Sequence, residues 1–119
     1  MKPRLAVVSL WAEDVPATAH FYRDVIGLHP LPHHGARPHF DLDGIFLAIL
    51  KGRPSPAQDA DPLRFPVVAF AVDSLDAAVA RLRAHRIDLP WGIERDEHSR
   101  WAMFHDPAGN LIELVEFGE

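Results

Sequence analysis

The chain has 119 residues, a formal net charge of -5, 48% hydrophobic residues and 24% charged residues. This length allows one ordinary domain or two small structural repeats, and the composition favours a folded core over disorder. The absence of cysteine excludes disulfides and thiolate metal sites, the acidic charge argues against nucleic acid as a partner, and no apolar run is long enough to cross a membrane. The first residues lack the apolar stretch of a signal peptide, so we expect a cytoplasmic protein.

The first fifty residues predict a βαβββ module. We expect strands at 4–12, 28–33, 37–41 and 45–50, and a helix over 15–26. Asp14 can cap the helix, Pro16 suits its first turn, and Gly27 suits its end. The two middle strands contain proline and are expected at an edge. Residues 41–44 have Asp first and Gly fourth, which is typical of a type I turn.

The second half of the chain repeats this order. We expect strands at 65–72, 91–95, 100–105 and 111–117, and a helix over 75–86 that is capped by Ser74. The first strand and helix of the two copies align at an offset of 60 residues. The turns 41–44 and 106–109 align at an offset of 65. The proline-rich segment 51–64 is expected to link module 1–50 to module 65–119 within a single domain.

Alternation along the strands predicts which side chains face away from the helices. Leu5, Val7, Ser9 and Trp11 share one face, as do Phe65, Val67, Ala69 and Ala71 in the second copy; Phe46, Ala48 and Leu50 correspond to Leu111, Glu113 and Val115. Glu113 is the one charged residue among them. An unpaired carboxylate is costly to bury, so Glu113 either lines a polar cavity or lies at an edge in solvent.

Two segments carry a resemblance to a known family. Residues 19–28 (AHFYRDVIGL) and 104–116 (FHDPAGNLIELVE) resemble the helix-to-strand segment and the C-terminal motif of the vicinal oxygen chelate superfamily. That superfamily includes glyoxalases, extradiol dioxygenases and bleomycin-resistance proteins. The resemblance covers the whole chain. It implies an α+β fold, in which paired βαβββ modules form a cupped mixed sheet, and a homodimer.

The resemblance also implies where a metal ion would be held. Metal-dependent members use four His, Gln or Glu side chains from the first and last strands of each module, and these suit Mn, Fe, Ni or Zn. Here the matching positions are Val7, Leu47 or Ala48, Val67 and Glu113. Because only Glu113 retains a ligating group, we expect no metal cofactor, and a divalent metal remains the alternative.

The chain is therefore closest in character to the metal-free bleomycin-resistance branch. We expect a metal-independent protein that binds a small cationic or aromatic molecule, with antibiotic sequestration as one form of that activity. The candidate ligand-binding residues are Val7, Ser9, Trp11, His39, Ala48, Val67, Trp101 and Glu113. The alternatives are a lyase, isomerase or dioxygenase with an altered metal site, an enzyme with Glu113 as catalytic general base, or a scaffold without a ligand.

The histidines invite a second metal hypothesis. His39, His105 and Glu113 lie on strands predicted to be neighbours and would form a non-standard ligand set, with His33, His34 and His98 close to the same turns. The preferred interpretation is that these histidines are surface or turn residues, since His33 and His34 adjoin Gly35 and His105 directly precedes the turn Asp.

Overall fold

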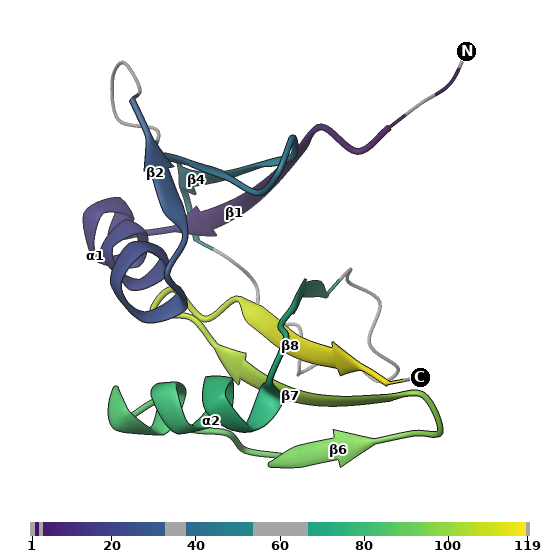
Figure 1. The fold of residues 1–119 in the computed structure, drawn as a ribbon. Coiled ribbons are helices and arrows are strands. Elements are labelled where there is room, and N and C mark those ends of the chain that lie inside the picture. The colour runs from purple at the N-terminus through teal and green to yellow at the C-terminus, as the bar shows by residue number, and fades with distance from the viewer. Residues whose placement is uncertain (1, 3, 33–37, 54–66, 119) are drawn as a thin grey trace. The chain divides into compact units, whose positions relative to one another are not determined.

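The structure is a computed structural model that describes residues 2, 4–32, 38–53 and 67–118. The chain divides into two compact units, residues 1–55 and 56–119. Each unit contains one four-stranded mixed sheet, and the elements of the two units follow the same order along the chain (Figure 1). The α+β class predicted from the sequence is confirmed. The described helices are too short and too polar to cross a membrane.

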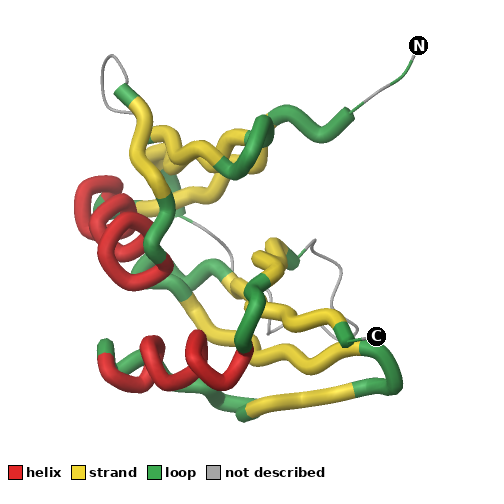
Figure 2. Tube along the Cα trace, viewed as in Figure 1, coloured by secondary structure: helices red, strands yellow, loops and turns green. Residues whose placement is uncertain are grey.

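The first unit has the strand order β1-β4-β3-β2. Its elements are β1 (Val7–Ala12), α1 (Val15–Phe21), the π-helical segment η1 (Tyr22–Ile26), β2 (His29–Leu31), β3 (His39–Asp41) and β4 (Phe46–Lys51). Strands β1 and β4 are parallel, whereas β3 is antiparallel to both β2 and β4. Figure 2 shows α1 and η1 as one continuous coil.

One face of this first sheet packs against the helical coil and forms the core of the unit. Leu47 and Ile49 of β4 are fully buried, and the buried ring of Tyr22 in η1 lies 6.3 Å from the ring of Phe40 in β3. The same alternation brings Leu10 and Ala12 of β1 to this face, and both are buried. The alternate side chains of each strand lie on the opposite face of the sheet.

The predicted helix starts as expected but changes form in its second half. The Asp14 carboxylate accepts a hydrogen bond from the Ala17 amide at 3.0 Å, which confirms the predicted cap. From Tyr22 onward the coil widens to a π-helix, because the Tyr22 carbonyl accepts from the amides of both Gly27 and Leu28. Gly27, with φ of 86°, then ends the coil in the left-handed region that glycine tolerates.

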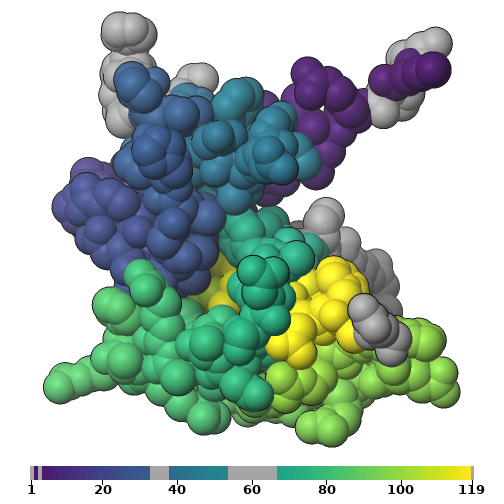
Figure 3. Space-filling model, viewed as in Figure 1, coloured from purple at the N-terminus to yellow at the C-terminus, as the bar shows by residue number. Residues whose placement is uncertain are grey.

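The second unit repeats this topology with the strand order β5-β8-β7-β6. Its elements are β5 (Val68–Ala71), α2 (Leu75–Ala84), β6 (Ile93–Arg95), β7 (Ser99–His105) and β8 (Leu111–Phe117). Helix α2 packs on β7 and β8, where Ala102, Phe104, Ile112 and Leu114 are buried. The end of β8, drawn in yellow, remains at the surface of this unit (Figure 3), and the Phe117 side chain is 71% exposed.

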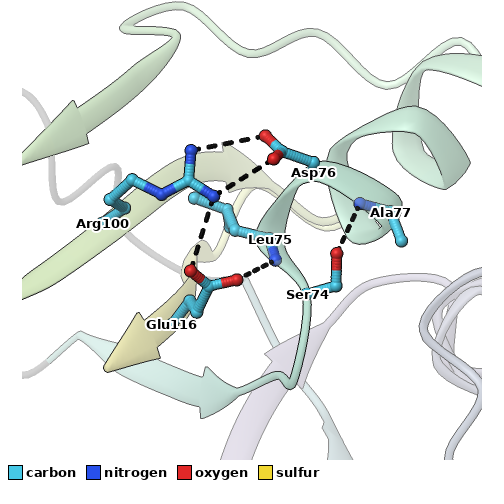
Figure 4. Close-up of polar contacts among 6 residues, drawn as sticks. All are labelled: Ser74, Leu75, Asp76, Ala77, Arg100 and Glu116. Carbon is cyan, nitrogen blue, oxygen red and sulfur yellow. Dashed lines mark hydrogen bonds and ion pairs between the residues drawn. The ribbon is translucent and has the colours of Figure 1, made fainter. Parts of the chain in front are cut away.

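Polar contacts fix the start of α2 against its sheet (Figure 4). The Ser74 hydroxyl accepts from the Ala77 amide at 3.1 Å, which confirms the predicted cap. The Glu116 carboxylate of β8 accepts from the Leu75 amide at 2.9 Å and lies 3.4 Å from the Arg100 guanidinium. Arg100 also donates two hydrogen bonds of 3.3 Å to Asp76. These groups therefore mark the α2 side of the sheet.

The strand registers match the two copies residue by residue. Ser9 lies opposite Ala48 in the first unit, and Ala69 lies opposite Glu113 in the second. The offset is therefore 60 between the first strands, from Ser9 to Ala69, and 65 between the last strands, from Ala48 to Glu113. Both offsets are those predicted from the sequence, so the two sheets are equivalent in register as well as in strand order.

Several predicted boundaries need correction. Strand β1 starts at Val7 rather than at residue 4, and β4 includes Lys51, which pairs with Ala12 and so does not begin the linker. Residues 54–64 of the predicted linker lie outside the described residues, as do the first two residues of the predicted strand 65–72.

Residues with a left-handed backbone conformation explain three further differences between the predicted and the observed elements. Helix α2 ends at Ala84 because Arg86, with φ of 61°, leaves the helical region. Strand β6 starts only at Ile93, because Gly92 has φ of 61° and its amide closes a turn onto Leu89. The turn at 41–44 is not type I, because Asp43 at its third position has φ of 58°.

Candidate functional site

Each sheet has a second face, opposite its helix, which we call the distal face. By strand register and alternation, the first distal face comprises Val7, Ser9, Trp11, His29, Leu31, His39, Asp41, Phe46, Ala48 and Leu50. Five of the predicted ligand-binding residues therefore share one face. Ser9, Ala48 and His39 form a single row across β1, β4 and β3. Leu47, by contrast, lies in the core, so Ala48 is the residue that matches Glu113.

The first distal face exposes apolar side chains to an unusual degree. Val7 is 48% exposed, Trp11 49% and Phe46 39%, although all three are strand residues in a sheet whose other face is buried. Exposed groups of large apolar side chains are typical of surfaces that bind a ligand or another protein.

The Trp11 indole is seated on the backbone of Gly52. A Cβ atom placed on Gly52 would lie 2.6 Å from Cε3 of Trp11, so the ring occupies the space that a larger residue would fill. The Gly52 amide is itself anchored by a 3.0 Å hydrogen bond to the Ala12 carbonyl. One side of the indole is thus packed, and about half of the residue remains accessible.

The second distal face contains the carboxylates. It comprises Ala69, Ala71, Glu94, Ser99, Trp101, Met103, His105, Leu111, Glu113, Val115 and Phe117. Glu113 lies opposite Ala69 on one side and Met103 on the other. Val67, predicted to belong to the site, lies just before β5 and has no strand pairing of its own, whereas Trp101 and Glu113 do share the face.

Glu113 lies in an environment that favours its neutral form. The residue is half-buried, so the prediction that it lies in open solvent is wrong. Burial raises the pKa of Glu113, and the negative charge of Glu94 raises that pKa further. The second distal face therefore holds two carboxylates close enough to repel each other.

Two polar atoms of this region are buried and unsatisfied. Among the residues that the structure describes, they are Glu94 Oε1 and His105 Nε2, and neither atom has a hydrogen-bond partner. His105 ends β7 directly before the turn, as expected, but it is half-buried rather than exposed, and its ring lies 5.9 Å from the Trp91 ring. The prediction of a surface histidine holds for His98, whose side chain is 81% exposed. His33 and His34 lie outside the described residues.

Glu94 is the site residue that sequence reasoning missed. In the sequence, the residues 93–95 are typical of a short strand, and their own pattern does not indicate which side chain lies on the distal face. The pairing of Glu94 with Trp101 places it on the distal face, beside predicted site residues. A signal was available, because a hairpin around residues 96–99 pairs residue 94 with residue 101 by simple counting.

The chain does not fit the metal site that the family resemblance implies. Val7 and Ala48 present alkyl groups on the first distal face, and Val67 provides a third alkyl group at its position. In the described ranges, no three His, Asp or Glu side chains lie close enough to hold a metal ion. Of the hypothetical set of His39, His105 and Glu113, His39 belongs to the first unit, whereas His105 and Glu113 share the distal face of the second unit.

These features define a duplicated βαβββ protein with one distal sheet face per copy. A family profile described as the Glyoxalase/Bleomycin resistance protein/Dioxygenase superfamily matches residues 4–114. The chain belongs to this superfamily, which confirms the resemblance found in the sequence at the level of the superfamily.

Individual relatives have different activities. The chain is 30% identical to the Uncharacterized protein YaeR of Escherichia coli, with 92% of each chain covered. It is 25% identical to the lactoylglutathione lyase of Agrobacterium tumefaciens, with 98% and 95% of the two chains covered and a TM-score of 0.73. The antibiotic binding protein TnmS3 of a Streptomyces species shares the fold, at 22% identity, 98% coverage of both chains and a TM-score of 0.78.

Proposed function

We propose that this protein binds a small organic molecule without a metal ion. The observation that carries the proposal is the replacement of ligating side chains by the alkyl groups of Val7, Ala48 and Val67, which leaves Glu113 alone. One carboxylate does not hold a divalent ion tightly in water, whereas apolar and aromatic surface with a few polar groups is typical of organic ligand sites.

The ligand-binding residues that we propose lie on the two distal faces. Trp11 and Trp101 provide flat rings, Ser9 and His39 provide hydrogen-bonding groups, and Glu113 provides a carboxylate. An antibiotic is a suitable ligand class, since the antibiotic binding protein TnmS3 shares this fold.

We also propose that the protein is a cytoplasmic homodimer. Light scattering tests the dimer, which should have a molar mass twice that of the chain.

Metal analysis and ligand titration test the proposal together. Protein purified without chelator should contain no stoichiometric Mn, Fe, Ni or Zn. Naphthylmethanol, a neutral aromatic probe, should raise the melting temperature of the wild-type chain and do so less for Trp11→Leu. Near-stoichiometric metal that disappears in Glu113→Ala, or a melting temperature unmoved by the probe, would contradict the proposal.

A second candidate function is supported by the environment of Glu113. A carboxylate whose pKa is raised by burial and by Glu94 is suited to act as a general base near neutral pH. In that case turnover should be lost in Glu113→Gln, and kcat/KM of the wild type should fall on the acid side as Glu113 takes up a proton. A substrate screen in which Glu113→Gln and wild type turn over equally would exclude this role.

A further inference from the structure

Glu94 and Glu113 lie on either side of strand β7 on the second distal face. Glu113 of β8 is paired with Met103, and Glu94 of β6 is paired with Trp101, two residues along the same strand. The side chains at 101 and 103 point to the same face because residues alternate along a strand. The two carboxylates therefore face each other diagonally across Met103 and Trp101.

This arrangement is costly in the unliganded protein. Glu94 Oε1 is shielded from solvent and accepts no hydrogen bond within the described residues, and the two negative charges repel each other. A buried acceptor without a donor loses its hydration and gains nothing in return. His105 Nε2, two residues from Met103 on the same face, is in the same condition. A bound group that donates hydrogen bonds would relieve these costs.

The chemistry of the face selects a positively charged group. Of the β5–β8 residues on this face, none is Lys or Arg, so the strands themselves supply no counter-charge. The strand cations Arg95 and Arg100 are paired with each other on the α2 side, where Arg100 binds Asp76 and Glu116. The Trp101 ring beside Glu94 offers a π-face that attracts cations, and Ala69 and Ala71 leave the β5 edge uncrowded.

We propose that Glu94 and Glu113 together bind a protonated amine or guanidinium group of the ligand beside the Trp101 ring, and that Glu94 is the residue that selects cationic ligands. This inference rests on the proposed function and deepens it, since it names the ligand class and adds a residue. An ammonium group can donate one hydrogen bond to each carboxylate, and charge-assisted hydrogen bonds of this kind are stronger than neutral ones.

Three probes that share one ring system test the inference. Naphthylmethylamine is cationic at pH 7, naphthylmethanol is neutral and naphthoate is anionic, so their affinities separate the charge from the aromatic ring. Isothermal titration of wild type should rank the amine first and the naphthoate last. Glu94→Gln and Glu113→Gln should each weaken the amine about tenfold or more and weaken the alcohol much less, because each removes a charge-assisted hydrogen bond that only the amine makes.

Glu97→Gln is the matched control. Glu97 lies in the turn between β6 and β7 with its side chain 92% exposed, and its replacement changes the net charge by the same amount. The cation site would be overturned if Glu94→Gln and Glu97→Gln bound the amine equally well, or if naphthoate bound wild type as tightly as the amine. The proposed function would then still stand if the alcohol binds. Failure of all three probes to bind would overturn both.

Discussion

Replacing Gly52 with alanine should displace the Trp11 indole. The added Cβ would lie 2.6 Å from Cε3 of Trp11 and 3.3 Å from both Cδ2 and Cζ3. The shortest of these distances is about 0.9 Å inside the lower end of ordinary carbon–carbon contact, ~3.5 Å. The Gly52 backbone cannot withdraw easily, because its amide is bonded to the Ala12 carbonyl. The ring must therefore move.

The structure also sets the expected size of the effect. Overpacking a well-filled site costs about 1–3 kcal/mol, and a ring that is already half exposed can turn toward solvent, so we expect a loss of stability near 1 kcal/mol. The larger change should be spectroscopic, since the indole loses the packing on one of its sides. Binding of naphthylmethanol should weaken as well if Trp11 is a preformed stacking surface.

Fluorescence measures this displacement directly. In a Trp91→Phe, Trp101→Phe background, Trp11 is the only emitter, and Gly52→Ala should shift its emission to longer wavelength. Gly118→Ala is the matched control, since the nearest atom to its added Cβ, the His98 carbonyl oxygen, lies at an ordinary 3.5 Å. If Gly52→Ala and Gly118→Ala gave the same spectrum and urea midpoint, the inferred seating of Trp11 on Gly52 would be refuted.

Three further predictions concern stability. Glu113→Gln should raise the melting temperature of the unliganded protein by a few degrees at neutral pH. Because the folded-state pKa of Glu113 is raised, this gain should shrink as the pH falls below that pKa and vanish below the ordinary Glu value of about 4.3; a gain independent of pH would contradict the assignment. Phe104→Ala, at a fully buried residue, should cost about 3–5 kcal/mol in urea unfolding, against about 0.5 kcal/mol or less for Phe117→Ala, which is 71% exposed. Arg100→Gln should lower the urea midpoint at low salt more than Arg95→Gln does, because Arg100 joins β7 to β8 and α2, and equal midpoints would show that this network is not stabilising.

Much of the architecture could be predicted because both halves of the sequence show the same order of strand, helix and turn patterns. Each copy alternates apolar side chains along its first and last strands, and the offsets of 60 and 65 residues already fix the register in which Ser9–Ala48 corresponds to Ala69–Glu113. A one-residue slip would move every apolar side chain to the other face, so the pattern tolerates little error. The helix caps at Asp14 and Ser74 were also predictable, because each is a hydrogen bond between residues three apart in the sequence.

The rest depended on contacts between residues that are distant in sequence or on backbone detail. The π-helical form of Tyr22–Ile26 arises from one carbonyl accepting two amides, which no side-chain pattern reports. The contact of Trp11 with Gly52 joins residues that are 41 positions apart in the sequence, and it requires β1 and β4 to be adjacent. The unsatisfied state of Glu94 and His105 depends on what surrounds each atom, which composition and spacing do not specify.

The two copies have kept one backbone and diverged in chemistry at equivalent positions. The row Ser9, Ala48 and His39 in the first sheet corresponds to Ala69, Glu113 and Met103 in the second. At the positions that match the family's metal ligands, the first copy has Val7 and Ala48, and the second has Val67 and Glu113. Because the first distal face has exposed apolar surface around Trp11, while the second has Glu113 and Glu94, the two faces are suited to different groups. Flat apolar rings suit the first face, and a positively charged group suits the second.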